Sequence, residues 1–138
     1  MRPFAASVLV AAVCAQQVGA VAEQDHHLTS ISWNAKSLLL IQSRASYGRM
    51  IRLASGCILC AYVHGGRVSV RLSADDGRTW NEPCLAASFE YGTATNPELL
   101  SLGGDRLLLS FNQRPSDAGQ PFGIAVCFSD DEGATWSG

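Results

Sequence analysis

Residues 73–80 read SADDGRTW and residues 129–136 read SDDEGATW, so five positions match in register. The two copies begin 56 residues apart. Each follows a run in which apolar side chains alternate with others, over residues 67–72 and 122–128, and such alternation predicts a strand. The repeated octapeptide is therefore predicted to form the turn of a β-hairpin.

The matching residue types suit a turn. Asp75 and Asp131 can accept hydrogen bonds from backbone N–H groups further along the loop, and Gly77 and Gly133 permit a positive φ. The Thr-Trp pair is expected to open the next strand, with the indole packed under the hairpin. A calcium loop is the alternative, but the spacing misses the EF-hand pattern and its final glutamate. We expect a structural role for Ser73, Asp75, Gly77, Thr79, Trp80, Ser129, Asp131, Gly133, Thr135 and Trp136.

Reading outward from the turns, the same unit occurs twice. Each unit is predicted to hold four antiparallel strands joined by glycine-marked turns, and repetition of such units at about fifty residues is typical of a β-propeller. The predicted fold class is all-β, with about two four-stranded blades at residues 47–90 and 91–138, the second incomplete. Residues 37–42 can add a strand that closes another blade. The strands are predicted at residues 49–53, 57–63 and 67–72, then 97–102, 106–111 and 122–128.

The pattern S-x-D-x-G-x-T-W resembles the Asp-box, or bacterial neuraminidase repeat, of the sialidase-like propellers, which include sialidases and exo-arabinanases. The resemblance covers residues 47–136 and implies a six-bladed propeller of which this chain holds about a third. It implies a glycoside hydrolase that removes terminal glycosyl units from a glycan, needs the blades downstream, and uses no cofactor or metal. A non-catalytic propeller for glycan binding or adhesion is the alternative.

The strand order gathers polar side chains at the end of the sheets opposite the Asp-box turns. First strands begin there and second strands finish there, and sialidase-like sites occupy this end. Amide and guanidinium donors such as Asn96, Asn112, Gln113 and Arg114 can bind sugar hydroxyls or acids. The candidate residues are Arg49, Asn96 and Arg114 for substrate binding, and His64 and Glu98 for catalysis.

Arg49 lies in the segment YGRMI at residues 47–51, which resembles the F/Y-R-I-P segment of the sialidases. The arginine of that segment binds the substrate carboxylate, for which a guanidinium is well suited because it can make two parallel hydrogen bonds. The match is partial, because Ile51 stands where proline is expected. Arg49 is therefore either such a clamp or an exposed strand arginine paired with a neighbouring acid.

The resemblance also implies an aspartate general acid near the end of the second strand, where this chain has Val63 and His64. His64 can transfer protons near neutral pH, or it can be a solvated turn residue. Glu98 can supply one of the two carboxylates that most glycosidases use, or it can simply follow Pro97 into a strand. The nucleophile and its partners would lie on later blades.

The first 22 residues have the layout of a cleaved secretory signal. A basic Arg2 precedes an apolar run over residues 4–14, and residues 20–22 form a small-residue cleavage site. The run is too short to span a bilayer. A buried helix and a lipid anchor at Cys14 are the alternatives. We expect a secreted or periplasmic protein in which residues 23–46 form an N-terminal segment before the blades.

Composition and cysteines narrow the function classes. With 47% hydrophobic residues, 16% charged residues and a net charge of −2, the chain is neither a disordered acidic tail nor a basic nucleic-acid-binding arm. Cys57 and Cys60 lie in a predicted strand, where side chains three apart point to opposite faces, so a redox or zinc site is not expected. With Cys84 and Cys127 they allow up to two disulfides in any of three pairings.

Overall fold

The computed structural model describes residue 32 and residues 34–137. The chain divides into two units, residues 1–33 and 34–138, and every element described below belongs to the second unit. The expected secretory signal over residues 1–22 lies outside the described residues. Of the expected N-terminal segment over residues 23–46, the structure describes residue 32 and residues 34–46.

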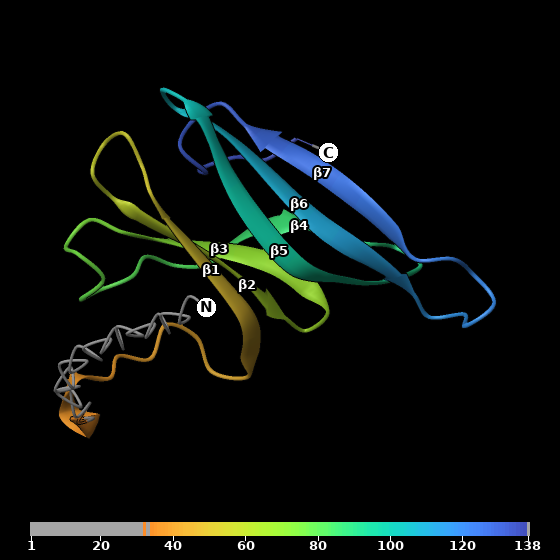
Figure 1. The fold of residues 1–138 in the computed structure, drawn as a ribbon, viewed down its shortest axis with the longest axis horizontal. Coiled ribbons are helices and arrows are strands. Elements are labelled where there is room, and N and C mark those ends of the chain that lie inside the picture. The colour runs from red at the N-terminus through yellow and green to blue at the C-terminus, as the bar shows by residue number, and fades with distance from the viewer. Residues whose placement is uncertain (1–31, 33, 138) are drawn as a thin grey trace, which may run out of the picture. The chain divides into compact units, whose positions relative to one another are not determined.

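The described residues form seven strands in two antiparallel sheets (Figure 1). The strands lie in chain order, β1-β2-β3-β4 in the first sheet and β5-β6-β7 in the second, and neither sheet closes on itself. The predicted all-β fold is thus confirmed. A short 3-10 helix, η1 (Ala35–Ser37), precedes the strands, which are β1 (Ala45–Arg52), β2 (Ile58–His64), β3 (Arg67–Ser73), β4 (Cys84–Ala87), β5 (Gly92–Gly103), β6 (Arg106–Pro115) and β7 (Gly123–Ser129).

Two strand predictions were wrong. Residues 37–42 contain no strand; Ser37 ends η1, residues 38–42 follow as irregular chain, and Leu38 to Leu40 are exposed rather than paired with a neighbouring strand. The Thr79-Trp80 pair does not open the fourth strand, which begins only at Cys84 after Pro83, a residue that cannot donate to a ladder. In the second sheet the place of the fourth strand is taken by a single bridge between Phe128 and Ser137.

Each Asp-box closes its turn through its own side chains. Buried Ser73 donates its hydroxyl to Asp75 Oδ1 (2.8 Å) and accepts from the Gly77 N–H (2.8 Å). The backbone N–H and the hydroxyl of Thr79 donate to the two oxygens of Asp75 (2.8 and 2.6 Å), and the Trp80 indole N–H donates to the Gly77 carbonyl (3.1 Å). The second copy repeats these bonds at equivalent positions.

These hydrogen bonds favour ionised aspartates. The Thr79 hydroxyl, then its backbone N–H, then Ser73, lower the pKa of Asp75 to about 2, and Thr135 and Ser129 do the same for Asp131. The residue before each glycine also has a positive φ, 57° at Asp76 and 54° at Glu132, in addition to the glycines. The hydrogen bonds within each octapeptide therefore stabilise its turn.

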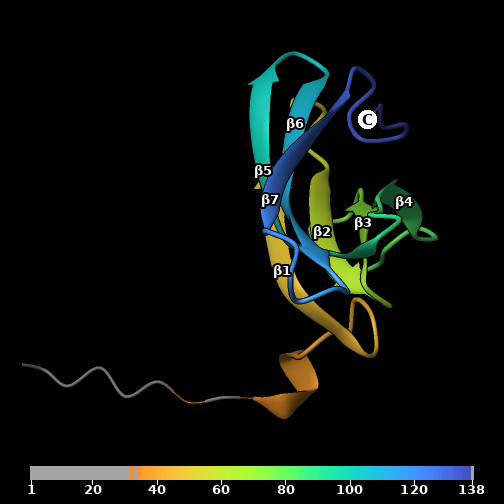
Figure 2. The ribbon, with the colours of Figure 1, turned by 90° about the vertical axis from the view of Figure 1, so that its right-hand side faces the viewer.

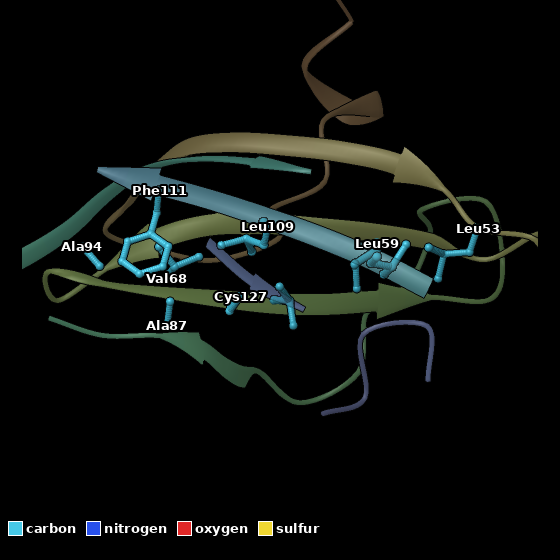
Figure 3. Close-up of a cluster of buried hydrophobic side chains, with 11 residues drawn as sticks. Leu53, Leu59, Val68, Ala87, Ala94, Leu109, Phe111 and Cys127 are labelled. Atoms are coloured by element: carbon cyan, nitrogen blue, oxygen red, sulfur yellow. The ribbon is translucent and has the colours of Figure 1, made fainter. Parts of the chain in front are cut away.

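The two sheets pack face to face, as the edge-on view in Figure 2 shows. The core between them contains Leu59, Ala61, Val68 and Val70 from the first sheet (Figure 3). Burial of each large side chain stabilises the fold by roughly 1.5–3 kcal/mol. The second sheet contributes Ala94, Leu107, Leu109, Phe111 and Cys127.

In the second sheet, the face that corresponds to the buried face of the first sheet is exposed. By the 56-residue repeat, Val70 of β3 corresponds to Val126 of β7, and Val68 corresponds to Ile124. Val68 and Val70 are 0% and 2% exposed, whereas Ile124 and Val126 are 79% and 46% exposed. We call the surface of Leu100, Ile124, Val126 and Phe128 the open face; it has the chemistry of a sheet-to-sheet interface.

The cysteines of the blades are all free thiols. Cys60 is buried outside the core cluster, whereas Cys57 packs against that cluster, so the two side chains lie on opposite faces as predicted. Burial raises the pKa of the Cys60 and Cys127 thiols to about 11, which makes them poor nucleophiles at neutral pH.

Candidate functional site

The end of the sheets opposite the Asp-boxes brings together the starts of both first strands and the finish of both second strands. In the first sheet Ala45 at the start of β1 lies opposite His64 at the end of β2. In the second sheet Thr93 of β5 lies opposite Arg114 of β6. The strand pairing puts His64 and Arg114 at this end, whereas Arg49, opposite Ala61, and Glu98, opposite Ser110, lie nearer the middle of the first strands.

A β-bulge interrupts the first strand of each sheet at this end. The register shifts between Ser46 and Arg49 in β1, and between Thr95 and Glu98 in β5. Inside each bulge one residue is left-handed, Tyr47 with φ 55° and Asn96 with φ 51°. Asparagine adopts this region readily, but tyrosine seldom does, and bulges are frequent beside functional sites because they redirect side chains.

The two bulges deliver Arg49 and Glu98 into contact. Arg49 Nε donates to Glu98 Oε1 at 2.7 Å, and Arg49 Nη1 donates to the Gly48 carbonyl at 3.2 Å. The side chains are 47% and 59% exposed, so the pair is solvated. Among the described residues no hydrogen bond forms at Nη2, so this is the guanidinium nitrogen left to donate to a carboxylate from solution.

The residues two positions before Arg49 and Glu98, Tyr47 and Asn96, line a pocket of about 240 Å³, which we call the Arg114 pocket. Two of its residues, Asn96 and Arg114, were predicted site residues. The Arg114 guanidinium carbon lies 5.5 Å from the centre of the Phe122 ring, a cation–π contact that holds the guanidinium against an aromatic wall. The lining consists of Tyr47, Thr95, Asn96, Asn112, Arg114 and Phe122.

The Arg114 pocket combines aromatic walls with fixed hydrogen-bonding groups. Asn96 and Asn112 each offer an amide donor and acceptor, Thr95 offers a hydroxyl, and Arg114 offers cationic donors. Such a mixture suits a polyhydroxylated or acidic small ligand. Sequence reasoning passed over Tyr47, Thr95 and Phe122 as pocket residues, because their placement depends on the bulges and on the β6–β7 loop.

His64 lies apart from these groups. It is exposed at the end of β2, it does not line the Arg114 pocket, and within the described part of the chain it forms no hydrogen bond with Arg49 or Glu98. The turn after it is tied to the second sheet instead, because the Ala94 N–H donates to the Gly66 carbonyl at 2.8 Å.

Glu98 has a cationic partner and not a second carboxylate. Its oxygen Oε1 is held by Arg49, and among residues 34–137 no group of three or more His, Cys, Asp and Glu side chains is placed to hold a metal ion. The described residues also include no helix with the length and apolar character needed to cross a membrane. The side chains described at this end are guanidinium, carboxylate, amide, hydroxyl and aromatic groups.

No protein-family model matches the sequence, and no curated protein matches it. Among solved structures, the chain is similar to one described as NanB plus Optactamide, with 24% sequence identity and a TM-score of 0.48. The similar region covers 64% of this chain and 12% of that one, so this chain spans only a small part of its structural neighbour.

Proposed function

We propose that the chain supplies two blades, residues 47–90 and 91–138, of an exported sialidase-like β-propeller that acts on terminal glycosyl units bearing a carboxylate. The observation that carries the proposal is the convergence of Arg49, Asn96, Glu98 and Arg114 at one end of two packed sheets. Two of these residues form an ion pair and the other two line one pocket.

In this proposal Arg49 binds the substrate carboxylate and Glu98 positions Arg49. Glu98 occupies Nε, so the guanidinium is held in one orientation and can present its Nη2 edge. Asn96 and Arg114 then contact hydroxyl groups of the same glycosyl unit from within the Arg114 pocket. His64 is given no role in this proposal, because among the described residues it forms no hydrogen bond with Arg49 or Glu98.

Further blades complete the site. The open face supports this part of the proposal, since it repeats the residues that the first sheet buries against the second. A third sheet packed on the open face would extend the propeller and bring its own first strand toward the Arg114 pocket. The groups that cleave the glycosidic bond are assigned to those sheets, so hydrolysis requires them.

The test measures binding to this chain and turnover by a product that includes the further blades. The ligand is N-acetylneuraminic acid for binding, and sialosides and arabinan fragments are the substrates for turnover. Arg49→Ala and Arg49→Lys should both abolish binding and turnover, because a lysine keeps the charge but loses the planar fork.

Arg52→Ala is the matched control. Arg52 also forms an exposed ion pair, with Asp76 at 2.9 Å, but at the Asp-box end of the sheets. It should leave binding and turnover unchanged. Equal activity of the Arg49 variants and the parent would remove Arg49 from the site and contradict the proposal.

A second candidate function is glycan binding without hydrolysis. One observation favours it: Val63 and His64 stand where the resemblance implies a general acid, and His64 is not joined to Glu98. Binding that is lost in Arg49→Ala, together with no turnover by the product that includes the further blades, would select this function over the first.

A further inference from the structure

A second cleft lies at the same end of the sheets, where β6 finishes and β5 begins. It has a volume of about 530 Å³ and is the space between the β4–β5 connection and the β6–β7 loop. Phe89 and Tyr91 form one wall, and residues 115–117 with 120–121 form the other. We call it the Tyr91 cleft.

The walls of the Tyr91 cleft are fixed to each other. The Ser116 N–H donates to the Tyr91 carbonyl at 2.9 Å, which joins the two walls directly. On the loop side, Asp117 Oδ1 accepts from the Gly119 N–H at 2.8 Å, and the Asp117 carbonyl accepts from the Gln120 N–H at 3.1 Å. The cleft is therefore preformed by backbone bonds and by an Asx turn.

Tyr91 presents an aromatic platform. Its side chain is 70% exposed, and its ring meets the ring of half-buried Phe89 edge to face, with centroids 5.9 Å apart and planes at 72°. Phe89 packs against the core cluster, so the contact anchors an exposed ring to the body of the protein. A large aromatic side chain held in solvent is suited to stacking against the C–H face of a sugar ring.

The polar groups opposite the platform suit an uncharged ligand. Ser116, Asp117 and Gln120 supply hydroxyl, carboxylate and amide groups, which together donate to and accept from sugar hydroxyls. The residues that line the Tyr91 cleft include an aspartate but no lysine or arginine, so an anionic group would be repelled there. The Arg114 pocket has the opposite charge.

At both ends of the β6–β7 loop, neighbouring residues of the chain line different cavities. Arg114 lines the Arg114 pocket and Pro115 lines the Tyr91 cleft, while Phe122 lines the former and Pro121 the latter. Arg114 and Pro115 are consecutive residues of β6, so their side chains point to opposite faces of the sheet and the two cavities are separate sites. We propose that the Tyr91 cleft binds a neutral glycosyl unit, an inference that rests on the proposed action of this protein on glycans.

The experiment titrates the full chain with two separate probes, lactose as the neutral sugar and N-acetylneuraminic acid as the acidic one, and follows backbone NMR shifts. Lactose should shift resonances of residues 89–91 and 116–121. Tyr91→Ala should raise the Kd for lactose about fivefold, since an aromatic contact of this kind contributes on the order of 1 kcal/mol. Tyr91→Phe keeps the ring and should retain binding.

The outcomes separate the two proposals. If lactose does not bind, or binds equally to Tyr91→Ala, the assignment of the Tyr91 cleft is wrong even when the acid still binds. If the acid fails to bind the parent chain, or binds Arg49→Ala equally, the proposed function fails whatever lactose does. Tyr91 is mostly exposed, so its variants should fold, and circular dichroism checks this.

Discussion

Arg49 and Glu98 occupy the same position in the two sheets and bind each other. Arg49 lies opposite Ala61, which lies opposite Val70, and Glu98 lies opposite Ser110, which lies opposite Val126, the repeat equivalent of Val70. Each residue follows its left-handed bulge residue by two positions. A position that is duplicated by the repeat has thus acquired opposite charges in the two copies, and the 2.7 Å ion pair joins them.

The ion pair should contribute little to stability. Because both side chains are about half exposed, we expect a double-mutant cycle with Arg49→Ala and Glu98→Ala to give a coupling of about 0.2–1 kcal/mol in the free energy of unfolding. Chemical denaturation of the four proteins measures it. A coupling well above this range would assign the pair to the architecture and not to a binding site.

The buried serine of the Asp-box should matter more. Ser73→Ala removes the acceptor of the Gly77 N–H and a donor to Asp75, so the turn should lose about 1–3 kcal/mol in the free energy of unfolding. Ser129→Ala should have a similar effect. Exposed Ser88→Ala is the control and should change little. Similar stabilities for all three variants would contradict the role given to the hydroxyl.

The Asp-box aspartates predict a loss of stability in acid. Their pKa of about 2 lies below the value of about 3.9 expected in the unfolded chain, so their contribution is present above pH 4 and is lost as pH falls through about 2. The free energy of unfolding should therefore fall between these values. The slope should decrease in Asp75→Asn and in Asp131→Asn relative to the parent chain. A slope that is equal in all variants would contradict this assignment.

The open face predicts unequal effects of one substitution at two equivalent positions. Val70→Thr places a hydroxyl in the core and should cost about 1–3 kcal/mol. Val126→Thr should change the free energy of unfolding by less than about 0.5 kcal/mol and reduce self-association of the chain. Denaturation and sedimentation measure the two effects. Equal costs would mean that Val126 is buried in solution.

Gly92 should be required for the close approach of β5 and β6 beside the Arg114 pocket. A Cβ there would lie 2.1 Å from the Arg114 carbonyl oxygen, whereas a Cβ at Gly48 meets nothing within 4 Å. Gly92→Ala should therefore cost roughly 1–3 kcal/mol, and Gly48→Ala much less. A Gly92→Ala protein as stable as the parent would show that the strands can separate freely.

The sequence predicted those strands in which apolar and polar residues alternate without a break, or which end at a glycine-containing turn. Residues 67–72 became β3 almost without change, because Val68, Val70 and Leu72 alternate without interruption. The first strands were predicted too short: β1 begins at Ala45 and β5 at Gly92, several residues before the predicted starts. Both contain a bulge at a residue other than glycine, which breaks the period of two and carries no local signal.

The site could be predicted only as an end of the sheets. Strand order alone placed Arg49, Asn96, Glu98 and Arg114 together there. The partner of Arg49 could not be predicted, since it depends on how two sheets pack across the core, and residues 49 and 98 are far apart in sequence. The position of the loop residue Phe122 in the Arg114 pocket also depends on tertiary packing, so the sequence around Phe122 does not predict it.

The open face also gives the stack of sheets a direction. The face of the first sheet that carries Val70 packs against the face of the second that carries Leu109 and Phe111, so the contact is heterologous and its two sides cannot be exchanged. A further sheet packed on the open face would have to present to it a face of the kind that carries Leu109 and Phe111. Such a head-to-tail array of sheets has two unlike ends. It is complete when its last sheet packs against its first, not when two like surfaces pair about a twofold axis.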